Sequence, residues 1–224
     1  MSLLAMAWRY LMFRRLVTFL TVACLSLGVA LVCAVLALRH ESENALSRDA
    51  GLYDLVAGGK GSPLQLVLSS VYHLDSPTGN IAFTEYERLR RDSRVLWAAP
   101  IGLGDNYAGY RIVGTEAHFF DLPDREGGRF FQMARGNVFK DSFEVVLGSQ
   151  VASATGLDIG DSFCGTHGLV EVPGGEVHQD FPYRVSGVLE PTGTAQDRAI
   201  FGTLKSVWDC LLYTSPSPRD QRGS

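Results

Sequence analysis

One uncharged run, from Leu16 to Leu38, dominates the hydrophobic pattern of the chain. It holds seven leucines and five valines, and its polar side chains are no larger than threonine. As a helix rising about 1.5 Å per residue, the run spans roughly 34 Å, which exceeds the ~30 Å hydrocarbon core of a bilayer. The pattern therefore predicts a transmembrane helix over residues 16–38.

The residues before this run, 1–15, are apolar but carry Arg9, Arg14 and Arg15, and no acidic residue precedes Glu41. A basic, aromatic-containing segment beside a span is typical of an amphipathic lead-in that lies at the membrane surface. Because positive charge is retained on the cytoplasmic side, the N-terminus is predicted to be cytoplasmic.

A cleaved signal peptide is the alternative interpretation of the same segment. Its basic start is present, and Val35–Ala37 could pass for a weak cleavage site. However, the apolar region of a signal has about 7–15 residues, and this run is longer. The pattern favours an uncleaved anchor, with everything after Arg39 outside the membrane.

Small residues recur along one face of the predicted span, at intervals of three or four. Such a stripe lets helices approach closely in lipid, where packing rather than hydrophobicity drives association. The sharper hypothesis is that this face packs against other membrane helices, and the simpler alternative is that alanine is common in membrane helices. The stripe consists of Ala23, Ser26, Ala30, Ala34 and Ala37.

Polar and apolar positions are mixed beyond the span. Residues 39–50 are polar without a helix breaker, which predicts a helical stalk, and residues 51–209 predict one mixed α+β domain. Short apolar runs predict strands at Leu52–Gly59, Val95–Ile101, Tyr110–Gly114, Glu144–Leu147, Gly160–Phe163, Tyr183–Leu189 and Ala199–Phe201.

Three helices are predicted within this domain. Thr84 and Glu87 have the spacing of a capping box, which predicts a helix from Glu85 to Arg91. A second helix, 149–155, is stopped by Gly156, and a closing helical turn is expected over 203–209.

Residues 210–224 abandon this pattern for a stretch rich in serine, proline and arginine. The stretch resembles translated sequencing-adapter read-through, and a natural disordered tail is the alternative. We expect the chain to be a C-terminally truncated piece of a longer protein.

Charge and cysteine content exclude several classes of function. After Arg15 the chain has 17 basic and 24 acidic residues, and this net charge of −7 argues against a nucleic-acid partner. Cys24 and Cys33 lie in the predicted span, and Cys164 and Cys210 alone form neither a disulfide framework nor a metal knuckle.

No catalytic, cofactor-binding or metal-ligating residues are assigned. Residues 58–62 superficially resemble a phosphate-binding loop, but Asp54 and Gly61 stand where that motif needs glycine and a hydroxyl residue. No G-x-S-x-G nucleophile elbow is present. A glycine-rich stretch has residue types that bind zinc, but their spacing matches no standard motif: His167, Glu171, Glu176, His178 and Asp180. His73 and His118 lie beside apolar residues and are predicted to be packed or surface groups.

The order of these pieces resembles permeases of the MacB/FtsX/LolC type of ABC transporter, over about residues 1–208. The order and spacing of the matching segments carry the resemblance, because each is a structural turn or strand. These segments are Arg14–Arg15, Asp54–Gly58, Gly61–Leu68, Tyr110–Thr115, Val146–Gly148, Thr155–Asp161, Tyr183–Leu189, Pro191–Thr194 and Asp197–Arg198.

The resemblance implies a MacB-like periplasmic core domain on a bacterial inner-membrane permease that is not itself an enzyme and needs no cofactor. It implies a separate cytoplasmic ABC ATPase, a second permease copy and the lipid bilayer as partners. It also implies three further membrane helices that this chain lacks. The alternative function is a single-span, membrane-anchored periplasmic binding or scaffold protein.

Overall fold

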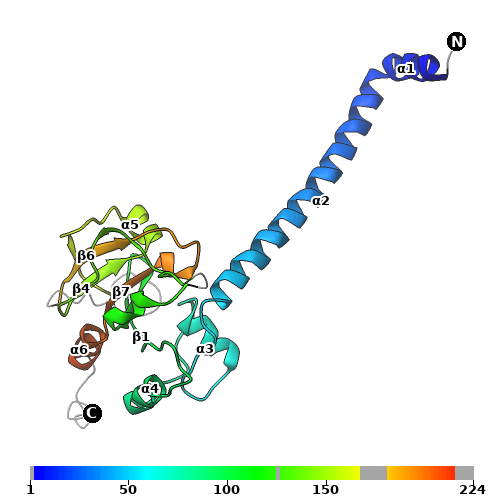
Figure 1. Ribbon diagram of the computed structural model, residues 1–224. Coiled ribbons are helices and arrows are strands. Elements are labelled where there is room, and N and C mark those ends of the chain that lie inside the picture. The colour runs from blue at the N-terminus through cyan, green and yellow to red at the C-terminus, as the bar shows by residue number, and fades with distance from the viewer. Residues whose placement is uncertain (1–2, 125–126, 167–180, 215–224) are drawn as a thin grey trace, which may run out of the picture. The chain divides into compact units, whose positions relative to one another are not determined.

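A computed structural model describes residues 3–124, 127–166 and 181–214. The chain divides into two compact units, Met1–Arg48 and Asp49–Ser224. The first unit is helical, and the second combines a mixed sheet with short helices (Figure 1).

The first unit contains α1, Leu3–Phe13, and α2, Arg15–Ala50. Within α2, Arg15–Glu43 is long and apolar enough to cross a membrane, with a mean hydropathy of 2.6. The hydroxyls of Thr21 and Ser26 donate to carbonyls of the preceding turn, so these polar side chains are satisfied inside the helix. Because α2 runs from Arg15 to Ala50, the predicted span, 16–38, and the predicted stalk, 39–50, belong to one unbroken helix.

The second unit is built on a seven-stranded sheet. Its path runs β1-β2-β7-β4-β6-β3, and β5 pairs with β6. The pairs β2–β7 and β4–β6 are parallel, and the other pairs are antiparallel. The strands are β1 Gly102–Tyr107, β2 Tyr110–Thr115, β3 Met133–Gly136, β4 Glu144–Leu147, β5 Ser162–Phe163, β6 Tyr183–Leu189 and β7 Ala199–Thr203.

Apolar side chains are buried on both faces of this sheet. Successive residues of a strand point to opposite faces, so Ile112 joins one core and Val113 the other. The first core includes Val151 of α5, Ser149–Thr155, and Val207 of α6, Leu204–Thr214. The second core is rich in phenylalanine: Phe119, Phe120, Phe131, Phe139 and Phe201. Burial on both faces explains why β4 and β7 contain the continuous apolar runs Val145–Leu147 and Ala199–Phe201.

The second unit has four further helical segments among its described residues. Two are α-helices that precede it, and two are 3₁₀ turns, one after β2 and one before β7. They are α3 Pro63–Ser70, α4 Phe83–Arg90, η1 Ala117–Asp121 and η2 Ala195–Arg198.

Several predicted elements are confirmed. Strands β2, β4, β5, β6 and β7 lie where the pattern predicted them, and α5 ends at Gly156, whose φ of 73° gives the expected left-handed cap.

Two predicted strands are wrong: Leu52–Gly59 and Val95–Ile101 have no strand pairing. In the second segment, the carbonyls of Ala98 and Pro100 bind the side chains of His118 and Thr115 instead of a neighbouring strand. Conversely, β1 and β3 were not predicted, because their glycine-containing sequences lack apolar alternation.

The predicted capping box is also wrong. Helix α4 begins at Phe83 with Ala82 at its N-cap, and no side chain caps it. Instead of reaching back, Glu87 pairs with Arg91 one turn later, with Oε2 and Nη2 3.5 Å apart.

The start of the predicted tail at Cys210 differs from the structure. Cys210 belongs to α6, which continues to Thr214. The Cys210 side chain is buried, and its thiol donates a hydrogen bond to Asp105 of β1. Residues 215–224 lie outside the described residues.

Candidate functional site

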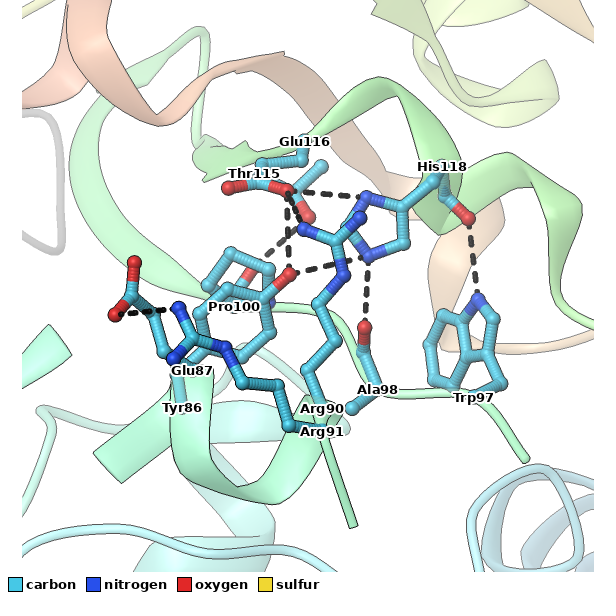
Figure 2. A network of polar contacts seen from close by, with 10 residues as sticks. All are labelled: Tyr86, Glu87, Arg90, Arg91, Trp97, Ala98, Pro100, Thr115, Glu116 and His118. Atoms are coloured by element: carbon cyan, nitrogen blue, oxygen red, sulfur yellow. Dashed lines mark hydrogen bonds and ion pairs between the residues drawn. The ribbon is translucent and has the colours of Figure 1, made fainter. Parts of the chain in front are cut away.

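A network of polar contacts joins α4 to the sheet through η1 (Figure 2). We call it the α4–η1 network and define it by Tyr86, Arg90, Glu116 and His118. Tyr86 and Arg90 are one helical turn apart, so both extend from the same face of α4 toward Glu116. Glu116 and His118 follow β2 directly.

The Glu116 carboxylate is the centre of this network. Its Oε2 accepts a hydrogen bond of 3.2 Å from the Tyr86 hydroxyl and lies 3.8 Å from Nη1 of Arg90. The same oxygen is 3.1 Å from Nδ1 of His118. Burial and the Glu116 charge raise the pKa of Tyr86, so Tyr86 remains a neutral donor.

His118 uses both ring nitrogens. Its Nε2 lies 2.7 Å from the Ala98 carbonyl, which only accepts hydrogen bonds, so Nε2 carries a proton. Its Nδ1 faces the Glu116 carboxylate, which only accepts hydrogen bonds. The backbone carbonyl of His118 in turn accepts from Nε1 of Trp97, 3.1 Å away. The network therefore fastens α4 and the segment before β1 to the end of β2.

A second polar contact ties the end of α3 to η2. His73, in a left-handed conformation with φ 56°, is buried, and its Nε2 lies 3.0 Å from Oε1 of Gln196. The Gln196 amide donates to the Val71 carbonyl over 3.1 Å. Burial lowers the pKa of His73, and the nearby Arg111 adds to this, while hydrogen bonds to Gln196 and Ser69 oppose it. His73 is therefore neutral near pH 7.

An open depression of about 650 Å³ lies beside α5 and the loop before η2. Its one acidic side chain, Asp197, is already used within the loop. One oxygen accepts from the backbone N–H and hydroxyl of Thr192, and the other accepts from the Gly193 N–H. The lining residues are Tyr110, Ser149, Gln150, Ser153, Ala154, Pro191, Gly193 and Asp197. Besides this carboxylate, they supply hydroxyl and amide groups.

The residues singled out in the sequence have structural roles or lie outside the described residues. The stretch with His167, Glu171, Glu176, His178 and Asp180 lies outside them. Over the described ranges, no three His, Cys, Asp or Glu side chains gather closely enough to hold a metal. His73 and His118, predicted to be packed or surface groups, both make polar contacts within the domain: His73 is buried, and His118 is partly exposed.

The glycine-rich segment 58–62 packs against a turn. The Gly59 carbonyl accepts from the Thr78 hydroxyl over 3.1 Å, and a Cβ at Gly59 would lie 2.9 Å from the Gly79 backbone. The glycines of this segment thus allow a close approach of two backbones.

Neither of the cysteines outside the predicted span, Cys164 and Cys210, forms a disulfide in the structure. Burial raises the pKa of Cys210 to about 12, and its Sγ donates to Asp105 over 3.3 Å. A thiol that stays protonated is a poor nucleophile.

Sequence reasoning missed Glu116 and Gln196, which centre the two polar contacts. Glu116 and His118 are two residues apart, but Tyr86 and Arg90 come from another element, so no local motif marks them. Gln196 is a lone glutamine in a loop and gave no signal.

The profile of the MacB-like periplasmic core domain matches residues 18–221. No curated protein matches the chain. Among solved structures, the chain is similar to the periplasmic region of MacB from Actinobacillus actinomycetemcomitans, with 14% sequence identity and a TM-score of 0.42. This similarity covers 59% of the chain and 59% of that structure.

Proposed function

Because the chain belongs to the family of the MacB-like periplasmic core domain, found in ABC transporter permeases of the MacB/FtsX/LolC type, we propose that it is a coupling subunit. In this function, a cytoplasmic ATPase drives movement of the membrane helices, and α2 passes that movement to the extracytoplasmic domain. The match over residues 18–221 is the observation that carries the proposal.

The properties of α2 support a mechanical role. It is continuous over 36 residues, which corresponds to a length of about 54 Å. Its charged continuation is reinforced by an ion pair between Nε of Arg39 and Oε1 of Glu43, 2.8 Å apart on successive turns. An unbroken helix transmits a tilt or shift along its axis better than a hinged one.

The two polar contacts of the second unit support the same role. The α4–η1 network and the His73–Gln196 contact hold the segment before the sheet onto the sheet itself. These contacts support movement of α3, α4 and the sheet as one body when α2 moves. No residue of this body is assigned a catalytic role, and ATP hydrolysis would belong to the partner.

The proposed topology is that of an inner-membrane protein with a cytoplasmic N-terminus. Residues 1–15 lie at the cytoplasmic surface, residues 16–38 cross the bilayer, and residues 39–50 form the stalk. The core domain, from residue 51 to about 209, is periplasmic. A second permease copy completes the membrane assembly.

The test is purification of the natural full-length protein together with the ATPase encoded beside its gene. We expect the natural gene to continue past codon 210 with three further spans, and the ATPase to co-purify and hydrolyse ATP. An intact gene that stops at codon 224, with no ATPase bound, would instead favour a single-span binding or scaffold protein.

A further inference from the structure

The backbone turns sharply at Arg14, between α1 and α2 (Figure 1). In an unbroken helix, the carbonyls of Leu11 and Met12 would accept from backbone N–H groups four residues later. Here side chains serve them instead. The Thr18 hydroxyl donates to Leu11 over 3.1 Å, and Nε of Arg15 donates to Met12 over 3.2 Å. The turn, which we call the elbow, is therefore stabilised by its own side chains.

Positive charge is concentrated at the elbow. Arg9, Arg14 and Arg15 are exposed, and the first acidic residue of the chain is Glu41. The Arg14 guanidinium lies over the Tyr10 ring, 5.6 Å from its centroid, which orients it at the turn. No carboxylate of the described first unit lies near enough in sequence to neutralise these three charges.

The apolar surface around the elbow indicates what it contacts. Trp8, Leu11 and Phe13 of α1 are exposed, with 88% of Phe13 accessible. The candidate membrane span begins at Arg15, so these side chains are continuous with a lipid-facing surface. An apolar helix with tryptophan and tyrosine beside a span is typical of the headgroup boundary.

We propose that the elbow binds the phosphate of an anionic phospholipid, through the guanidinium groups of Arg9, Arg14 and Arg15. Arginine is suited to this ligand because its planar fork donates two parallel hydrogen bonds to phosphate oxygens. The proposal rests on the proposed function only for its leaflet, since a cytoplasmic N-terminus places the lipid in the cytoplasmic leaflet. The lipid would hold α1 in the plane of the membrane surface.

The test is native mass spectrometry of the full chain in detergent with phosphatidylglycerol or phosphatidylcholine. We expect phosphatidylglycerol to be retained, and Arg14→Gln to weaken its retention about fivefold, since one arginine near an anionic surface has an effect of this order. Combining Arg9→Gln with Arg14→Gln should weaken it further. Arg15 is left unchanged in these variants because it also caps Met12.

The matched control is Arg39→Gln, which removes an exposed arginine at the far end of the span. It should leave phosphatidylglycerol retention unchanged. Equal loss with Arg14→Gln and Arg39→Gln, or equal retention of phosphatidylcholine, would overturn the proposal. Displacement of the lipid by millimolar inorganic phosphate would also overturn it, because the ligand would then be free phosphate.

Detergent has no leaflets, so this result does not depend on the orientation of the chain. Lipid retention without a co-purifying ATPase would leave the elbow proposal standing and reject the coupling function. An intact ATPase complex without lipid binding would reject the elbow proposal and leave the coupling function standing.

Discussion

At the residue scale, Gln196 connects two segments that are distant in sequence. Its amide satisfies both the Val71 carbonyl and Nε2 of His73, and the side chain is 1% exposed. Such a buried amide is difficult to replace, because its loss leaves two buried polar groups with no hydrogen-bond partner and no access to water.

We expect Gln196→Ala to lower the free energy of unfolding by about 1–3 kcal/mol, through these unsatisfied groups. The measurement is urea denaturation of the full chain in detergent, with tryptophan fluorescence as the signal of unfolding. Gln150→Ala, on the exposed face of α5, is the matched control and should change the midpoint little. Equal effects of the two substitutions would contradict the structural role of Gln196.

His73 makes stability depend on pH. Burial lowers its pKa in the folded state, so the unfolded chain gains a proton more readily as the pH falls below about 6.5. The contribution of neutral His73 is therefore present above that pH and lost below it. We expect the unfolding midpoint to decrease between pH 7.5 and 5.5, and to decrease less in His73→Asn.

Asparagine is chosen because it tolerates the left-handed backbone of His73 better than most residues. The comparison uses the slope of the midpoint with pH, since His73→Asn also changes the contact with Gln196. Parallel slopes for the two proteins would exclude His73 as the titrating group.

The contact between His73 and Gln196 could not be identified from the sequence. Their contact depends on where the chain returns after six of the seven strands, because η2 precedes β7 in the sequence. His118 was predicted to be a packed or surface group, but its contacts with Tyr86 and Glu116 were not predicted, because Tyr86 comes from a separate element.

At the element scale, the elbow depends on Thr18. We expect Thr18→Val to speed amide hydrogen exchange in residues 11–18 about three- to tenfold in nanodiscs, because Leu11 loses its hydroxyl donor. Thr21→Val is the control, since the Thr21 hydroxyl bonds within its own helix to Val17 and Thr18. If both variants exchanged equally fast, the cross-elbow bond would have no special role.

Elements with strong local signals were predicted well. The alternation of Tyr183–Leu189 predicted β6, and Gly156 marked the end of α5 because its left-handed backbone favours glycine. The prediction of a capping box was wrong because α4 begins at Phe83, before Thr84. The Phe83 ring packs against Trp208, with ring centroids 5.8 Å apart, and this tertiary contact favours the earlier start. Strand β1 was missed because its neighbour β2, and not its own sequence, determines its pairing.

At the scale of the whole molecule, the small-residue stripe on α2 bears on assembly. We expect Ala30→Leu to leave membrane insertion unchanged but to reduce dimer cross-linking of the full-length permease about three- to tenfold, because leucine separates close-packed helices. Insertion is measured by carbonate extraction and assembly by cross-linking in membranes. Gly28→Leu, on the opposite face of the helix, should preserve the dimer. An unchanged dimer in Ala30→Leu would reject the stripe as a packing face.

The class of the molecule, a membrane helix followed by a mixed α/β domain, was predictable because it depends on hydropathy and local periodicity. The strand order was not. The parallel pairing of β2 with β7 joins segments from opposite ends of the domain, and no local pattern specifies it.

This strand order affects when the sheet can fold during synthesis of the chain. Among the seven strands of the described sheet, β7 comes last in the sequence, yet it lies between β2 and β4 and pairs with both. Until Ala199–Thr203 has been synthesised, β2 and β4 each present an open edge that invites pairing with other chains. Contacts this distant in sequence also form slowly. The sheet is therefore completed late in synthesis, and we expect the new chain to depend on chaperones that shield strand edges.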